Sequence, residues 1–331
     1  MSEGGRPLRG VALRGAVLPV TFDSRLILTL RCARSPRGRL ALVIAAAVVA
    51  LSWSSPQAAP APAAPELVYE HTVNGNQDLY VIPANGGKPR RLTTDPAVDA
   101  LPRWSRDGRE VYFTSDRSGN WQIYAVPAAG GAPRRVRTNG HREWQVDPSP
   151  DGGVIAFLSN AQGPEYLYVM DLRSGAERVL ARHGRRTGLG NPHWSADGRR
   201  IVFSTNWRQG HGIHVVNARS GEERPLDETL AGACEPRFHP DGKRVVYVSR
   251  GGHRDVSRLV EHDIATGAKK VLVDWPALNY NPVYSPDGAE IAFTSNVTGE
   301  YVVYRQRLAD GRSWRVTFGA GPARSPDYRP R

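Results

Sequence analysis

The stretch Pro102-Arg103-Trp104-Ser105-Arg106-Asp107-Gly108 decides the fold, because its pattern occurs five times in the chain. Each copy has an aromatic or small residue, then Ser or His, one variable residue and Asp-Gly. The other four copies end at Asp151-Gly152, Asp197-Gly198, Asp241-Gly242 and Asp287-Gly288, so the aspartates are 44, 46, 44 and 46 residues apart. A fixed period of about 40–45 residues with strand-like sequence between the marks predicts an all-β fold, a β-propeller of four-stranded antiparallel blades.

One period, from residue 101 to 137, reads as one blade. Residues 101–105, 110–115, 122–126 and 133–137 are short strand-like runs separated by turn residues, and β-branched and aromatic residues are most frequent in the second. The first unit, residues 66–93, lacks an inner strand and an Asp-Gly turn. Residues 322–328 carry a degenerate copy of the pattern. We therefore expect six blades, with the C-terminal strand pairing with the N-terminal blade to close the ring.

The repeated Asp-Gly pairs are predicted to form turns and not to act as catalytic carboxylates. Gly tolerates positive φ, and Asp hydrogen-bonds its own nearby backbone. The predicted structural turns are Asp107, Gly108, Asp151, Gly152, Asp197, Gly198, Asp241, Gly242, Asp287 and Gly288. Aromatic residues at a fixed repeat position are expected to pack between neighbouring blades; they are Trp104, Trp194, Phe238 and Tyr284.

The first 63 residues differ in composition from the rest of the chain. Residues 1–39 hold all eight arginines of this region and are expected to be a basic, disordered segment. Residues 40–51 are an apolar run, shorter than the ~20 residues that span a bilayer but typical of a secretory signal. A Pro/Ala-rich tail extends to residue 63. We expect residues 40–63 to be a signal peptide or an uncleaved membrane anchor, and residues 64–331 to be a propeller exported to the periplasm.

The net charge of +12 does not predict a nucleic-acid partner. Residues 64–331 carry 36 basic and 30 acidic residues, and much of the excess recurs in the predicted outer strand of each repeat. Charges on an exposed sheet edge discourage pairing with other chains, so we expect a monomer. Cys32 and Cys234 are the two cysteines, and only Cys234 lies in the predicted propeller. No intrachain disulfide is therefore expected there, and no cofactor is predicted.

The order of the motifs P-x-W-S-x-D-G, E-V-Y-F-T-S, I-Y, G-G and R-R-L-T resembles the C-terminal propeller of TolB proteins, periplasmic components of the Tol-Pal system. It is also similar to WD-repeat-like propellers of exported bacterial proteins and to the propeller of prolyl oligopeptidases. The resemblance covers residues 66–328. We expect no counterpart of the α/β domain that precedes the TolB propeller. The sequence has no G-x-S-x-G nucleophile elbow, so no peptidase activity is expected.

The candidate binding residues lie in the segments that differ most between repeats, which connect each outer strand to the next inner strand. These segments rim one face of the predicted disc. Loops on a rigid scaffold often carry binding residues, and Arg, Trp and Tyr are enriched at interface hot spots. The candidates are His141, Arg142, Glu143, Trp144, His183, Arg185, Glu235, Trp275, Asn279 and Tyr280. The alternative is that these segments only cover the blade ends with ordinary polar contacts.

We therefore predict a non-catalytic module that binds a protein or peptide partner in the cell envelope. The alternative is a carbohydrate-active lyase or hydrolase with a site at the channel mouth. No metal site is predicted, because the sequence has no H-E-x-x-H motif, cysteine pair or Asp-rich calcium loop. His211 and His214 are three residues apart on a predicted strand, so their side chains point to opposite faces and do not converge on one ion.

Overall fold

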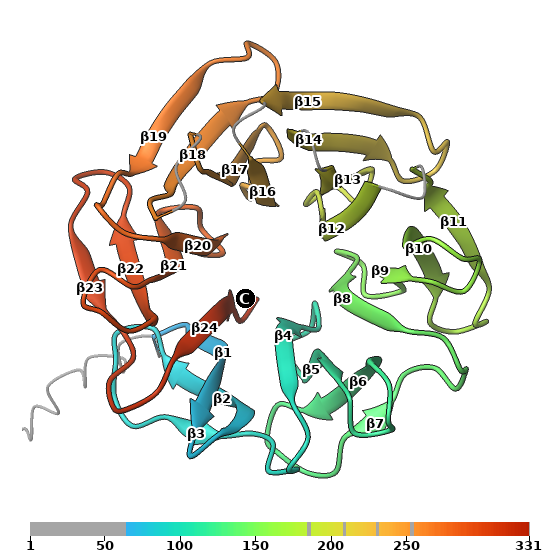
Figure 1. Cartoon of the computed structure of the whole chain (residues 1–331), viewed down its shortest axis with the longest axis horizontal. Helices are drawn as coiled ribbons and strands as arrows, with labels where there is room; N and C mark the ends of the chain where they lie inside the picture. Colours follow the sequence, from blue (N-terminus) through green and yellow to red (C-terminus); the bar gives the residue numbers. More distant parts are fainter. Residues whose placement is uncertain (1–63, 184–186, 208–209, 230–231, 252–254, 331) are drawn as a thin grey trace, which may run out of the picture. The chain divides into compact units, whose positions relative to one another are not determined.

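The computed structural model describes residues 64–183, 187–207, 210–229, 232–251 and 255–330. These residues form six four-stranded antiparallel sheets, arranged as the blades of a ring (Figure 1). The predicted six-bladed, all-β propeller is therefore confirmed. Within the described ranges, no helix is long and apolar enough to cross a membrane. The predicted segments 1–39 and 40–63 lie outside the described residues.

Each blade runs from an inner strand at the channel to an outer strand at the rim of the ring (Figure 1). Blade 1 comprises β24 (Ala323–Tyr328), β1 (Glu66–Val73), β2 (Asn76–Pro83) and β3 (Arg90–Arg91). Blade 2 comprises β4 (Asp99–Trp104), β5 (Glu110–Ser115), β6 (Gln122–Pro127) and β7 (Arg134–Arg135). Blade 3 comprises β8 (Glu143–Pro148), β9 (Val154–Ser159), β10 (Tyr166–Asp171) and β11 (Glu177–Ala181).

The second half of the ring has the same order. Blade 4 comprises β12 (Thr187–Trp194), β13 (Arg200–Trp207), β14 (Gly210–Asn217) and β15 (Glu223–Thr229). Blade 5 comprises β16 (Ala233–Phe238), β17 (Arg244–Ser249), β18 (Arg258–Asp263) and β19 (Lys269–Val273). Blade 6 comprises β20 (Asn279–Tyr284), β21 (Glu290–Ser295), β22 (Val302–Arg307) and β23 (Ser313–Arg315).

The ring is closed within blade 1 by the pairing of β24 with β1. Leu67 lies opposite Tyr328 and His71 lies opposite Ala323 in this antiparallel pair. The Arg329 N–H donates a hydrogen bond of 2.9 Å to the Glu66 carbonyl, which extends the pairing to the strand end. Strands from the two ends of the described chain thus share one sheet, as expected from residues 322–328.

The core lies between the blades, because each sheet packs against a neighbour on both faces. Strands β5 and β9 accordingly have buried side chains at every position but the first. Trp104 packs with Val68 and Leu79 of blade 1, and its indole Nε1 donates to the Asp327 carbonyl at 3.2 Å. The indole of Trp194 makes the equivalent hydrogen bond to Asp147 of blade 3, at 3.1 Å. These aromatic residues therefore join adjacent blades by packing and by a hydrogen bond.

The Ser-x-Asp-Gly pattern forms a turn that satisfies its own polar groups. The Ser105 hydroxyl donates to Asp107 at 2.7 Å and accepts the Glu110 N–H at 2.9 Å. Asp107 also accepts the Arg109 N–H at 3.0 Å. Gly108 has a φ of 65°, in the left-handed region where a side chain is strained. Each contact serves the connection from the inner strand to the second strand.

Every inner strand contains one non-glycine residue in the left-handed region, with φ between 50° and 56°. These six residues are Leu101, Gln145, Asn191, Glu235, Asn281 and Ser325. The pairing with the second strand shifts register beside each of them, so each one marks a β-bulge. The side chains of three of these residues accept the N–H of the bulge residue in the next blade, as Gln145 does for Asn191 at 2.8 Å. These three contacts form a partial polar belt around the channel.

Candidate functional site

The connections from each outer strand to the next inner strand lie at one end of the strands, here called the connection face. A groove of about 550 Å³ opens there across blades 3, 4 and 5. Its lining comprises Arg142, Trp144, Gln145, Glu165, Leu189, Gly190, Asn191, Ser204, Gly232, Cys234, Glu235 and Arg250. Burial raises the pKa of the Cys234 thiol, so this sulfur is a poor nucleophile at neutral pH.

Four exposed arginines stack on aromatic rings at this face. The Arg142 guanidinium carbon lies 4.5 Å from the Trp144 ring centre, and that of Arg250 lies 5.5 Å from the Tyr280 ring centre. Arg250 also donates to the Tyr280 hydroxyl at 2.9 Å. The other two pairs are Arg182 with Tyr166, at 5.7 Å, and Arg324 with Tyr301, at 4.1 Å. Stacking restricts each guanidinium while leaving its N–H donors available to a ligand.

The groove also contains two carboxyl groups, Glu165 and Glu235. Burial raises the pKa of Glu165, although Arg142 acts in the opposite direction. Burial also raises the pKa of Glu235, whose carboxylate accepts the Asn281 N–H from the next blade. Desolvation thus disfavours the negative charge of both groups.

The structure brings three of the predicted binding residues, Arg142, Trp144 and Glu235, into this groove. Tyr280 lies beside it through its contact with Arg250. His141 is exposed, and its carbonyl accepts a hydrogen bond from Gln122.

The other predicted residues have different surroundings. The side chains of Glu143 and Asn279 are fully buried: Glu143 pairs with Arg137 at 2.6 Å, and the Asn279 amide donates to backbone carbonyls. Trp275 packs edge-on against Phe293 and Tyr304, with ring centres 5.1 and 4.9 Å away. Arg185 lies outside the described residues.

The sequence analysis missed Arg182, Arg250, Tyr166 and the pair Arg324–Tyr301. Their partners lie on other strands, so the pairs depend on a register that a single strand does not reveal. A usable signal was present, because Arg182 and Arg250 each follow directly after the last residue of a strand, β11 and β17. An arginine that directly follows a strand ending at the connection face is expected to lie on that face.

The channel beneath the bulges contains a second belt of polar groups, at the residue just before the repeated aromatic position. Asp327 accepts the backbone N–H of Trp104 at 2.9 Å, and Asp147 accepts that of Trp194 at 2.8 Å. Burial raises the pKa of Asp147 to about 8 and that of Asp327 to about 6. Arg103 lowers both values, but its Nε lies 3.8 Å from Asp147, too far for a hydrogen bond that would offset the burial.

His193 occupies the equivalent position in blade 4. Its Nδ1 accepts the Phe238 N–H at 3.1 Å, and burial lowers the pKa of this imidazole to about 3, with Arg103 acting in the same direction. His193 is therefore neutral at physiological pH. A cavity of about 360 Å³ at the Asp-Gly face reaches Asp147, His193 and Asp327.

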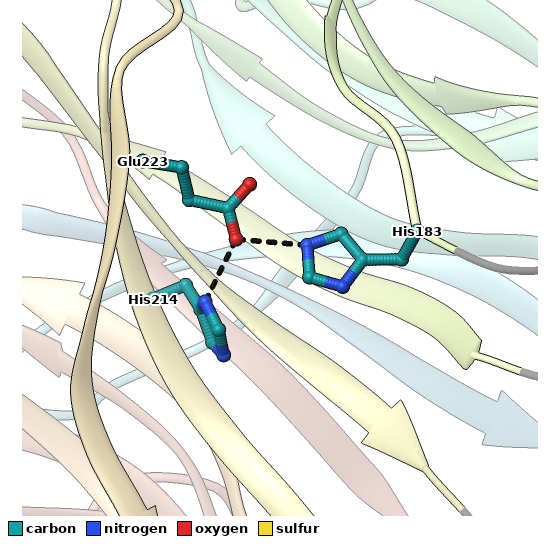
Figure 2. Close-up of side chains that lie close together, drawn as sticks. All are labelled: His183, His214 and Glu223. Atoms are coloured by element: carbon teal, nitrogen blue, oxygen red, sulfur yellow. Dashed lines mark hydrogen bonds and ion pairs between the residues drawn. The ribbon is translucent and has the colours of Figure 1, made fainter.

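One group of three metal-ligating side chains occurs among the described residues. It comprises His183, His214 and Glu223, whose donor atoms lie within 4.8 Å of one another (Figure 2). The sequence analysis compared His214 only with His211, which lies on the same strand. The partner of His214 in this cluster comes from another blade: His183 follows β11 of blade 3, whereas His214 lies on β14 of blade 4. Burial raises the pKa of Glu223, but its close contacts with both imidazoles outweigh burial and hold this pKa at about 2, so the carboxylate is ionised at neutral pH.

These features define a six-bladed propeller with an arginine-rich connection face. A family model described as the TolB beta propeller domain matches residues 45–188 and 148–260, together more than half of the chain. The chain therefore belongs to the TolB β-propeller family, which confirms the resemblance predicted from the sequence.

Two curated relatives match parts of the chain. Dipeptidyl-peptidase 5 of Porphyromonas gingivalis is 29% identical over 148 residues, covering 40% of this chain and 21% of the relative. The Tol-Pal system protein TolB of Nitratidesulfovibrio vulgaris is 30% identical over 112 residues, covering 33% of this chain and 24% of the relative. The chain thus spans about a quarter or less of the length of each of these relatives.

Among solved structures, TolB from Acinetobacter baumannii superposes with a TM-score of 0.71 at 18% identity. The match covers 81% of this chain and 67% of that one. This likeness shows that the two proteins share the propeller fold.

Proposed function

We propose that this protein is a non-catalytic binding module whose connection face holds an acidic segment of a protein partner, in the cell envelope. The observation that carries the proposal is the set of arginines stacked on aromatic rings at the connection face, with Arg142–Trp144 and Arg250–Tyr280 at the groove. Arginine forks bind carboxylates in a bidentate manner, and Trp, Tyr and Arg dominate the energy of protein interfaces.

A protein segment fits this surface better than a nucleic acid does. Sequence-tolerant binding of single strands needs aromatic faces on which bases can stack. Here one face of each of the four rings is occupied by its own arginine, at 4.1–5.7 Å. The N–H groups at the edges of the guanidinium planes remain available as hydrogen-bond donors, and their geometry suits the two oxygens of a carboxylate.

The contacts of the buried titratable side chains in the channel favour a structural role over a catalytic one. Asp147, Asp327 and His193 each accept a backbone N–H from the inner strand of the next blade. Each of these groups therefore takes part in a contact between blades. Degradation of an oligosaccharide by the purified protein would support the carbohydrate-active alternative.

The decisive experiment is photo-crosslinking in the native cell from a reactive amino acid placed at position 144, in the groove. Position 314 on β23, where Trp314 is 37% exposed, is the matched control site away from the groove. We expect a discrete protein product from position 144 only. Fractionation of the same cells tests the envelope location.

The arginine variants test the chemistry of that product. Arg142→Ala combined with Arg250→Ala should remove it. Arg307→Ala should not, because Arg307 stacks on Trp314 at 5.6 Å on the outer edge of blade 6. A product that survives the double substitution, or one that nuclease digests, would overturn the proposal.

A further inference from the structure

The His183–His214–Glu223 cluster joins two blades in the outer half of the ring. Glu223 Oε1 lies 2.8 Å from His183 Nε2 and 2.7 Å from His214 Nδ1 (Figure 2). The two imidazole rings are perpendicular, with centres 5.4 Å apart. His214 and Glu223 come from the third and fourth strands of blade 4, so the cluster lies away from the channel, whereas His183 comes from the connection that leaves blade 3.

The preceding interface shows what this location contains when it is purely structural. Arg137, Tyr168 and Glu177 each precede His183, His214 and Glu223 by 46 residues, the same offset that separates Phe157 from Phe203. Arg137 Nη2 lies 2.5 Å from Glu177 Oε2, and its guanidinium covers the Phe157 ring at 5.0 Å.

Blade 4 keeps the glutamate and the phenylalanine of this arrangement. His183 covers Phe203 edge-on, with ring centres 6.0 Å apart. The arginine and the tyrosine, however, are both replaced by histidine, which turns an ion pair into a set of two imidazole nitrogens and one carboxylate oxygen.

The hydrogen bonds within the cluster are incomplete. Both imidazoles approach the same carboxylate oxygen, Glu223 Oε1. His214 Nδ1 is buried and makes no hydrogen bond, although it lies 2.7 Å from that oxygen. The Tyr168 hydroxyl at the equivalent position of the preceding interface also lacks a partner, but only the imidazole nitrogen is a ligand type that zinc prefers. A buried polar atom without a partner costs about 1–3 kcal/mol. A cation that accepts the lone pair of this nitrogen would satisfy it.

We propose that His183, His214 and Glu223 form a binding site for a divalent transition-metal ion, zinc by the nature of its donors, that joins blade 3 to blade 4. Two histidines and one glutamate are a ligand set that zinc adopts, with a fourth position open to water. Tetrahedral coordination at bonds of about 2.0–2.1 Å places ligands about 3.4 Å apart. The carboxylate therefore moves by about 0.6 Å from its present contacts of 2.7 and 2.8 Å.

The test uses the full chain without a polyhistidine tag, stripped of metal by a chelator and then titrated with zinc chloride against a chromophoric chelator. We expect one zinc ion per chain and a melting temperature that rises by several degrees with zinc, because the ion binds only the folded ring. Cobalt(II) in place of zinc should give the visible absorption of a four-coordinate site.

The matched variant is His183→Arg combined with His214→Tyr, which installs two residues of the preceding interface, and its melting temperature without metal checks that it folds. It should lose zinc affinity at least 100-fold and lose the zinc-dependent rise in melting temperature. His141→Ala, which removes an exposed histidine, should change neither. Failure of the stripped protein to bind one equivalent of zinc, or equal binding by the double variant, would overturn the proposal. The groove plays no part in either readout.

Discussion

Replacing Asp147 with Asn should remove a specific pH dependence of stability. In the folded protein the pKa of this carboxyl is about 8, because burial disfavours its charged form. In the unfolded chain it is about 3.9. Between these values the folded state binds one more proton than the unfolded state, so the free energy of unfolding falls as pH rises, by about 1.4 kcal/mol per unit.

This group alone should lower the stability of the parent protein by about 2 kcal/mol between pH 6 and 8. The amide of Asp147→Asn does not titrate, yet its oxygen can still accept the Trp194 N–H. The variant should therefore gain about 2 kcal/mol over the parent across the same range. Urea unfolding of both proteins at pH 6, 7 and 8 measures the difference, in which the common contribution of His193 cancels.

Asp327→Asn is the matched control. Asp327 accepts the backbone N–H of Trp104 from the next blade, as Asp147 does that of Trp194, but its pKa is about 6. Its gain over the parent should appear between pH 4 and 6 and amount to less than about 0.5 kcal/mol between pH 6 and 8. Parallel stability curves for Asp147→Asn and the parent from pH 6 to 8 would refute the argument. Such curves would mean that Arg103 keeps Asp147 ionised.

Three further predictions concern the stability of the fold. Deletion of residues 322–331 should lower the melting temperature strongly, and Tyr328→Ala alone should cost about 3–5 kcal/mol, since Tyr328 is buried in the core between blades 6 and 1; an unchanged thermal melt would contradict the closure by β24. Ser105→Ala should cost about 1–2 kcal/mol in urea unfolding because it removes two turn contacts, whereas Ser118→Ala, at an exposed turn, should change stability by less than about 0.5 kcal/mol. Glu143→Ala should cost about 1–3 kcal/mol because it removes the buried one of the two carboxylates that contact Arg137, which keeps its contact with Glu177, and a cost below about 0.5 kcal/mol would exclude that role.

The fold could be predicted because its determinants repeat. The turn residues set the period, and the strand-like runs between them set the number of strands in a blade. Residues 322–328 could be assigned to the first blade because they retain a Ser-Pro-Asp remnant of the pattern. The β-bulges were not predicted: Leu101 and Gln145 carry no sequence mark of a left-handed backbone, since the ring geometry imposes it.

The candidate site was only partly predictable, because its contacts cross between strands and blades. Neighbouring side chains of β8 point to opposite faces, so Glu143 is buried whereas Trp144 reaches the groove. The sequence analysis placed both residues in a connecting loop, where no such alternation is expected. The metal-ligating cluster combines residues 31 and 40 positions apart. The comparison that would have found it is between repeats, where histidine replaces Arg137 and Tyr168 at the same 46-residue offset.

The closure of the ring by β24 makes the order of the blades along the chain largely arbitrary. The Glu66 carbonyl accepts the Arg329 N–H, so the two ends of the described unit are already adjacent. A circular permutant could join them through a short linker and begin at the connection between β7 and β8. Such a protein would keep every blade intact but carry its termini on blades 3 and 2 in place of blade 1, which would free the first blade from its dependence on two distant segments of the chain.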